Sequence, residues 1–357
     1  MTSVSQHAKV STTPDTDALH SNTRTVNSHQ SQDDITRLSD LITDYEHVQL
    51  KPSEYTDHQT QDIDQDIDPD NNFFFNLNEN CHYYTSEQFN AKIDCTGKLT
   101  IIHFNSRHLS KNFHAIKDYL HTFAIPFHVI AISESWITEG EETNYTLEGY
   151  DLVNINRQNK GGGGVGIFVI NDLQFHIVDE MTVTMDNVLE CITIEICMEK
   201  TKNIIISCIY RTPGTSIEIF TNWIDSMFSK FCNKVVVFCG DFNIDLLNPS
   251  NYSAIDTFIN TMYSVSLFPK ITRPSRITSY SATLIDNIFT NDIENKSESG
   301  LLIKDITDHL PVFVDMALVK LVIPAIVKPL THIFNLDSGK TLQLQVRIFF
   351  RKASTTF

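Results

Sequence analysis

From Leu99 onward, short apolar runs alternate with longer segments in which apolar residues recur every three or four positions. Short runs rich in Val, Ile and Phe and bounded by turn residues are typical of buried strands. In 189–197, isoleucines alternate with polar residues such as Thr193 and Glu195, so one face of this strand is expected in the core and the other in water. The pattern predicts strands at 99–104, 128–133, 150–154, 164–170, 189–197, 203–210, 234–239, 284–289 and 310–315.

Three segments have the spacing of amphipathic helices: 109–122, 217–231 and 254–264. In the first, Phe113, Ile116 and Leu120 lie on one face and can pack against a sheet. Strands interleaved with helices in this way favour a layered α+β domain. We expect a four-layered α/β sandwich, in which two packed mixed β-sheets are flanked by helices.

The remaining parts of the chain lack such a pattern. Residues 1–71 are rich in Ser, Thr, Asp, Gln and His, a composition that buries too little apolar surface to offset the entropy of ordering. We predict a disordered acidic segment there, with a weak helical spacing over 35–50, and a lead-in at 72–98 to the domain at 99–316. Residues 317–357 carry six Lys or Arg against one Asp and form a basic tail with no evident core.

Charge and cysteine content narrow the class of protein. The formal net charge is −17, and residues 1–97 hold five basic against 17 acidic side chains. This balance argues against a simple basic clamp for nucleic acid. The seven cysteines are odd in number and form no CxxC pair, which favours a reducing compartment. No apolar run approaches the roughly 20 residues of a membrane helix, so we expect a soluble intracellular chain without a membrane partner.

The candidate chemistry lies where polar residues interrupt apolar strands near their ends. Asn105, Glu134, Tyr210, Asp241 with Asn243, and Asp308 with His309 all lie at such places, and Asp286 lies inside its own strand. A carboxylate in an apolar run is costly unless it is paired or ligates a metal. Any one such residue is more often a turn former, but their joint order makes that explanation improbable.

These residues together form a set of hard oxygen donors with one imidazole, one phenol and one carboxamide. Such donors suit Mg²⁺ or Mn²⁺ better than zinc. Because no Ser, Cys or Lys nucleophile is evident, a divalent ion beside carboxylates indicates attack by water on a phosphate ester. No small organic cofactor is expected.

The ordered motifs HFNSR, ISESW, IYRTP, GDFNID, TLIDNIF and TDHLP resemble the endonuclease/exonuclease/phosphatase family, most closely the apurinic-type endonuclease domain of LINE-type retrotransposons. The resemblance covers residues 99–316. The segment 328–336, KPLTHIFNL, is similar to the stretch that introduces the reverse transcriptase of such elements. No reverse-transcriptase motif follows before Phe357, so polymerisation is not expected.

The resemblance implies roles for the matching positions. Asn105 and Glu134 would hold the metal, with Asp308 near it. Asp241 would orient or deprotonate the attacking water, and Asn243 would hold that water or a phosphate oxygen.

The resemblance also implies how the phosphate is bound. Tyr210 and His309 would donate to its oxygens in the transition state, and Asp286 would fix the imidazole of His309. Thr278 and Thr283 match hydroxyl positions that face the substrate. Cations near the motifs that can contact phosphates are Arg107, Arg157, Arg211, Arg273 and Arg276.

Three functions follow as hypotheses. The first is a Mg²⁺-dependent endonuclease that nicks DNA, for which access to the nucleus is expected. The second is a phosphatase or nuclease acting on another phosphoester, and the third is a catalytically dead remnant of a retroelement.

Residues 98–316 hold 16 basic and 26 acidic side chains, which disfavours long-range attraction to DNA. The sequence identifies no protein partner.

Three local features depart from the sequence patterns of functional sites. Ser135 stands where the family usually has Thr, and Thr307 stands where it usually has Ser. Both exchanges keep a hydroxyl, so the metal site is not placed in doubt. The run of four glycines at 161–164 opens a strand and lacks the Lys that follows in a phosphate-binding loop, so we interpret it as a flexible turn.

Overall fold

The computed structural model describes residues 36, 38–40, 42, 80–156, 162–198, 202–227, 230, 234–247, 253–293 and 297–317. The predicted disordered segment 1–71, the basic tail 317–357 and Arg157 therefore lie wholly or almost wholly outside the described residues. Within them, no helix is both long and apolar enough to cross a membrane.

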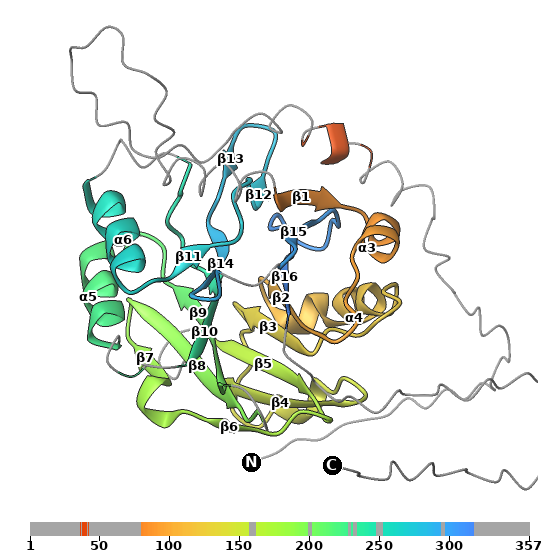
Figure 1. The fold of residues 1–357 in the computed structure, drawn as a ribbon, viewed down its shortest axis with the longest axis horizontal. Coiled ribbons are helices and arrows are strands. Elements are labelled where there is room, and N and C mark those ends of the chain that lie inside the picture. Colours follow the sequence, from red (N-terminus) through yellow and green to blue (C-terminus); the bar gives the residue numbers. More distant parts are fainter. Residues whose placement is uncertain are drawn as a thin grey trace, which may run out of the picture. The chain divides into compact units, whose positions relative to one another are not determined.

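The first sheet has seven strands in the order β1-β15-β16-β2-β3-β5-β4 (Figure 1). The pairs β1·β15 and β2·β3 are parallel and the others antiparallel, so the sheet is mixed. Strand β1 belongs to the predicted lead-in, and it forms one edge of the sheet. The bounds are β1 Cys81–Tyr84, β2 Lys98–Asn105, β3 Val129–Ser133, β4 Tyr150–Ile155, β5 Val165–Ile170, β15 Ser299–Leu302 and β16 Val312–Ala317.

The second sheet runs in the order β11-β14-β10-β9-β8-β6, and β7 also pairs with β8. Only β9·β10 is parallel, so this sheet is mixed too. A separate hairpin is formed by β12 and β13. The bounds are β6 Phe175–Ile177, β7 Val183–Met185, β8 Leu189–Ile196, β9 Ile204–Arg211, β10 Val235–Asp241, β11 Phe268–Pro269, β12 Arg276–Ile277, β13 Ala282–Thr283 and β14 Asp286–Thr290.

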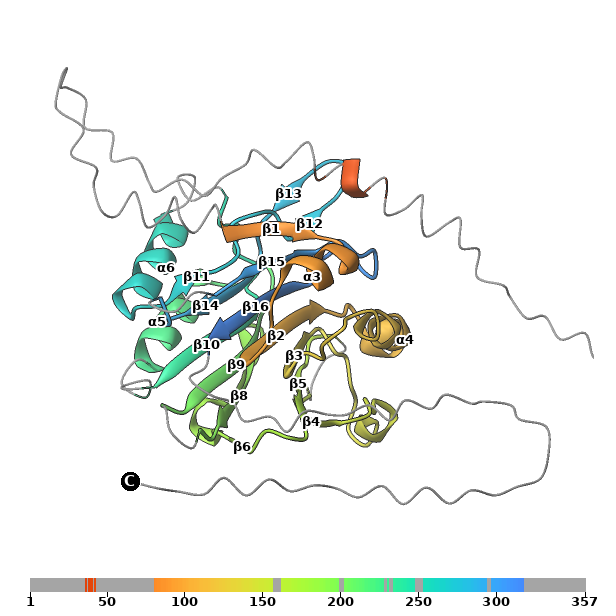
Figure 2. The same cartoon turned by 45° about the vertical axis from the view of Figure 1, so that its right-hand side comes forward.

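Helices cover the outer face of each sheet, as Figures 1 and 2 show. Ile116 and Tyr119 of α4 pack with Phe104 and Ile130 of the first sheet. On the second sheet, the rings of α5 and α6 contact Phe242 and Phe289. The helices are α3 Ser86–Lys92, α4 Leu109–Leu120, α5 Ile217–Met227 and α6 Ser253–Ser264, with short 3₁₀ turns at Glu142–Asn144 and Asp179–Met181. The expected four-layered sandwich is thereby confirmed.

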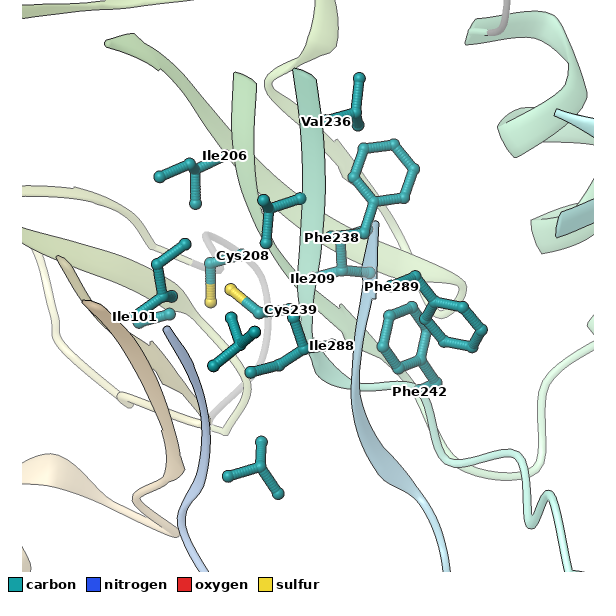
Figure 3. Packing of buried hydrophobic residues seen from close by; sticks show 14 of the residues in the cluster. Ile101, Ile206, Cys208, Ile209, Val236, Phe238, Cys239, Phe242, Ile288 and Phe289 are labelled. Carbon is teal, nitrogen blue, oxygen red and sulfur yellow. The ribbon is translucent and has the colours of Figure 1, made fainter. Parts of the chain in front are cut away.

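The core between the sheets follows from the alternation of side chains along the strands. In β10, Cys239 points toward Ile101 of the first sheet, whereas Phe238 points to the opposite side with Phe242 and Phe289 (Figure 3). Both faces of β10 are therefore covered by apolar residues, one facing the first sheet and the other facing away from it.

One expectation about the strands is wrong. Strand β8, which ends at Ile196, does not expose a face to water, because Thr193 is fully buried and Glu195 is 6% exposed. Cys197, just beyond the strand, is exposed. The hydroxyl of Thr193 donates to the carbonyl of Met181 at 3.1 Å, and Glu195 accepts from Lys234 Nζ at 2.7 Å. The polar face of β8 is thus buried under a neighbouring loop and satisfied by local partners.

Candidate active site

The register of the second sheet aligns three of the predicted residues. Asp241, the last residue of β10, pairs with Tyr210 of β9 on one side and with Asp286 of β14 on the other. Gly240 precedes it with φ 155°, and a Cβ there would lie 1.8 Å from the carbonyl oxygen of Ile209. Only glycine permits this close approach of β10 to β9, which explains the glycine of the GDFN motif.

The first sheet brings a second group to the same place. Asn105 ends β2 and pairs with Ser133, which Glu134 follows. The amide nitrogen of Asn105 donates to Glu134 Oε1 at 3.0 Å and to Asp241 Oδ2 at 2.8 Å. One carboxamide therefore joins carboxylates that come from different sheets. The amide oxygen of Asn105 accepts from the backbone N–H of Arg107 at 3.0 Å.

Glu134 lies in a strained backbone that glycines support. Glu134 and Trp136 have φ values of 50° and 52°, a region that side chains other than glycine seldom adopt. The N–H groups of Ser135 and Trp136 donate to the carbonyls of Gly164 and Gly163 at 3.1 and 2.9 Å. The glycine run expected as a flexible turn is thus the hydrogen-bonding support of the segment that carries Glu134.

His309 and Asp286 form a buried pair. Nδ1 of His309 lies 2.8 Å from Asp286 Oδ2, and that oxygen also accepts from Ser275 Oγ at 2.8 Å. Burial lowers the pKa of His309, but the negative charge of Asp286, with its hydrogen bond, outweighs it and raises the pKa to about 9. The imidazole is therefore a cation at neutral pH. The same interaction lowers the pKa of Asp286 despite its burial.

Asp241 lies beside this pair and is 1% exposed. Burial and the charge of Asp286 raise its pKa above the ordinary value, against the opposing effect of His309. Oxygens of Asp241 and Asp286 and a ring nitrogen of His309 lie within 4.8 Å of one another, a spacing that suits a metal ion once the imidazole has lost its proton.

Asp308 is predicted near the metal, and the structure places its carboxylate between two arginines. Arg107 forms an ion pair with Oδ1, and Arg276 Nε lies 2.8 Å from Oδ2. Burial raises the pKa of Asp308, but the hydrogen bonds from both guanidinium groups outweigh it and leave the pKa below the ordinary value. The two arginines are 50% and 40% exposed, so they also face solvent where a phosphate can approach.

Arg211 requires a correction, because it is not placed to bind substrate. It is 2% exposed, and its guanidinium donates to the carbonyl of Asn243 at 3.2 Å and to that of Thr215. Asn243 returns a hydrogen bond from Nδ2 to the carbonyl of Arg211 at 2.8 Å, and its own N–H donates to Asp241 Oδ1 at 2.9 Å. Arg211 thus positions the loop that carries Asn243.

The two predicted threonines lie on the β12–β13 hairpin. Thr283 pairs with Arg276 across it, and an isolated bridge joins Arg276 to His309. The hydroxyl of Thr278 accepts from the N–H groups of two residues in the turn, at 3.1 and 3.2 Å. The hairpin is therefore adjacent to the site, and Thr278 stabilises its turn.

Sequence reasoning missed Ser275 and His103. Ser275 Oγ accepts from the N–H of Asp286 at 2.9 Å and donates to its carboxylate, so it orients that side chain. His103 lies inside β2, where an imidazole in an apolar run is a signal of the same kind as Asp286. Arg273, another of the predicted cations, is half-buried and donates from Nε to the carbonyl of Cys81 at 2.6 Å.

Comparison with known proteins supports the fold. No protein-family model and no curated protein matches the sequence. The AP endonuclease LMAP from Leishmania major is 12% identical over 67% of this chain and 93% of its own, with a TM-score of 0.52. The endonuclease domain of TRAS1, a telomere-specific non-LTR retrotransposon, is 17% identical over 62% of this chain and 100% of its own, with a TM-score of 0.49.

An endonuclease/exonuclease/phosphatase family protein from Bacteroides thetaiotaomicron is 16% identical over 61% of this chain and 97% of its own, with a TM-score of 0.48. At such identities a structural likeness concerns the fold alone. The resemblance first seen in the motifs is confirmed at that level: the chain has the fold of the endonuclease/exonuclease/phosphatase proteins.

Proposed function

We propose that the chain is a metal-dependent phosphodiesterase that nicks DNA by attack of water on a backbone phosphate, as a retrotransposon-type endonuclease. One observation carries this proposal. The amide of Asn105 holds the carboxylates of Glu134 and Asp241 together, at 3.0 and 2.8 Å, beside the cationic His309. The AP endonuclease from Leishmania major has the same fold, which supports DNA as the substrate.

The donor set fits Mg²⁺ or Mn²⁺ at Glu134, whose carboxylate offers the oxygen ligands that these ions prefer. The amide of Asn105 contacts this carboxylate at 3.0 Å and offers an oxygen as a further ligand. At Asp286 the same ion would face the cationic imidazole of His309, so we place it on the side of Glu134. When bound, the ion would supply positive charge toward the phosphate oxygens.

Asp241 is the residue that orients and deprotonates the attacking water. Its raised pKa makes it a stronger base than an exposed Asp. Oδ1 of Asp241 accepts from the N–H of Asn243, so the loop bearing the carboxamide of Asn243 is held beside this base. One N–H of Asn243 Nδ2 donates to the carbonyl of Arg211, so its second N–H and its Oδ1 are left for a phosphate oxygen or the water.

His309 donates a proton or a hydrogen bond to the phosphate. Asp286 occupies its Nδ1, so Nε2 carries the proton that a phosphate oxygen can accept. With a pKa of about 9 this proton is present at neutral pH. Tyr210 lies at the same strand end as Asp241, where its hydroxyl can add a second donor as charge develops in the transition state. The product is a nicked strand.

Nicking of supercoiled plasmid by the purified chain with Mg²⁺ or Mn²⁺ tests this proposal. We expect open circles from the parent and none from Asp241→Asn or His309→Gln. Asp315→Asn is the matched control, because Asp315 is also a fully buried strand aspartate but is paired with Lys98 at 2.7 Å.

The other outcomes of this assay decide between the remaining hypotheses. A folded parent that leaves the plasmid intact yet hydrolyses small phosphoesters would assign the site to another substrate. A folded parent that hydrolyses neither would identify a catalytically dead remnant.

A further inference from the structure

His103 lies in the core between the two sheets, behind the candidate active site. It is fully buried in β2, where it pairs with Val312 of β16 and Ala131 of β3. Because side chains alternate along a strand, His103 shares its face with Asn105, two residues further on. A histidine in this position is costly unless its ring nitrogens have partners.

The two ring nitrogens of His103 face different groups. Nε2 lies 3.0 Å from Ser133 Oγ. Nδ1 lies 4.0 Å from Asp286 Oδ1. Among the residues that the structure describes, neither Nδ1 of His103 nor Oδ1 of Asp286 has a hydrogen-bond partner. Nδ1 of His103 and Oδ1 of Asp286 therefore lie opposite each other, and a shift of about 1 Å would give a hydrogen bond of ordinary length.

The tautomer of His103 follows from these neighbours. The ring nitrogens face one hydroxyl, that of Ser133, and one carboxylate, that of Asp286. The hydroxyl of Ser133 can either donate or accept, whereas an ionised carboxylate only accepts. A proton on Nδ1 satisfies both contacts, because Ser133 then donates to Nε2. A proton on Nε2 would set a nitrogen lone pair against the carboxylate.

We propose that His103 is a positioning residue of the active site: its Nδ1–H holds Oδ1 of Asp286, which leaves Oδ2 to hold His309. This inference rests on the proposed function. The resulting series of polar contacts joins Ser133, His103, Asp286 and His309, and it crosses from the first sheet to the second. Without His103, Oδ1 of Asp286 has no donor, and the carboxylate is free to rotate away from the imidazole that it orients.

Three substitutions separate positioning from packing. His103→Leu removes both nitrogens, His103→Asn keeps an amide nitrogen near the position of Nδ1, and His103→Gln moves it toward the position of Nε2. We expect His103→Leu and His103→Gln to lower kcat for nicking by roughly 10-fold to 100-fold with little change in KM. His103→Asn should recover most of the parent kcat. Parent kcat in the Leu variant, or equal kcat in the Asn and Gln variants, would overturn the proposal.

His128→Leu is the matched control for loss of a buried histidine. His128 is 4% exposed, and its Nδ1 lies 2.8 Å from Thr100 Oγ1 at the opposite end of the paired strands from Asn105. We expect it to lower the midpoint of urea unfolding as His103→Leu does, but to leave kcat unchanged. An equal fall of kcat in both variants would show that lost stability, and not positioning, is the cause.

A second measurement does not depend on turnover. In ¹⁵N-histidine NMR spectra of the full chain, with His103→Asn used for assignment, His103 should show the Nδ1–H tautomer. The Nε2–H tautomer would refute the inference even if the parent nicks DNA. If the parent does not nick, the proposed function fails, and the tautomer still decides whether His103 holds Asp286.

Discussion

The charge of Asp286 determines whether His309 is protonated, and its removal leads to a measurable change in stability. Burial alone would lower the pKa of His309, whereas the carboxylate at 2.8 Å raises it from 6.5 to about 9. Asp286→Asn keeps the shape of the side chain but removes its charge. We expect His309 to be neutral at pH 7 in this variant when no metal is present, because burial then dominates its pKa.

The magnitude follows from the two pKa values. Since the folded protein binds the proton of His309 more tightly, the stabilisation is fully present below pH 6.5 and is lost as the pH rises through about 9. At about 1.4 kcal/mol per pH unit, the free energy of unfolding of the parent should fall by about 3 kcal/mol across this interval. In Asp286→Asn the fall from His309 should be below about 1 kcal/mol.

Urea unfolding followed by tryptophan fluorescence in EDTA measures this difference. His309→Gln lacks the titrating group, so the fall that comes from His309 should be absent from its profile as well. His128→Gln serves as the control, because burial lowers the pKa of His128 to about 4, so its titration falls below the interval and the parent slope should remain. If Asp286→Asn loses as much stability over the interval as the parent, the carboxylate does not hold the proton on His309.

Three further outcomes are expected. Gly240→Ala should lower the free energy of unfolding by about 3 kcal/mol or more, because its Cβ would lie 1.8 Å from the carbonyl oxygen of Ile209. The control Gly214→Ala should lower it by about 1 kcal/mol, because no atom lies within 4 Å of the added Cβ. Equal midpoints of urea unfolding in the two variants would contradict this expectation. Arg276→Gln should weaken binding to duplex DNA and reduce the slope of log affinity against log salt by about 1; an unchanged slope would remove Arg276 from the interface. EDTA should abolish nicking and added Mg²⁺ should restore it, and activity that persists in EDTA would exclude a catalytic metal at Glu134.

Local sequence predicted the elements well because apolar periodicity reports which faces are buried. The nine strands expected between 99 and 315 are all present within a residue or two at most ends. The helix expected at 217–231 begins at Ile217 as predicted and is described to Met227, and residues 228, 229 and 231 lie outside the described residues. Periodicity could not show that β8 is buried on both faces, because Thr193 and Glu195 look like surface residues until their partners Met181 and Lys234 are known.

The chemical character of the site could likewise be derived from the chain. Polar residues at strand ends predict that their side chains meet at one edge of the sheets. The structure brings together Asn105, Glu134, Asp241, and His309 with its partner Asp286. The register of the second sheet aligns Asp241 with Tyr210 and with Asp286, and this alignment follows from strand pairing between segments that are distant in the chain.

Which of the polar residues are available to a ligand was decided by tertiary structure alone. Arg211 follows Tyr210 directly and has the charge to bind phosphate, yet its side chain is buried against the loop of Asn243. Asp308 is paired with two arginines that lie 201 and 32 residues away in the chain. Such contacts depend on how loops pack, which no spacing in the sequence encodes.

By itself, then, the sequence determined the layers, the strands and the set of carboxylates, because these depend on the alternation and spacing of neighbouring residues. Tertiary structure decided how the two sheets meet: one amide of Asn105 joins Glu134 to Asp241, and His103 of the first sheet faces Asp286 of the second. The physical reason is that burial and charge act through space. The pKa of His309 depends on groups brought together by folding, and only their distances determine whether it holds its proton.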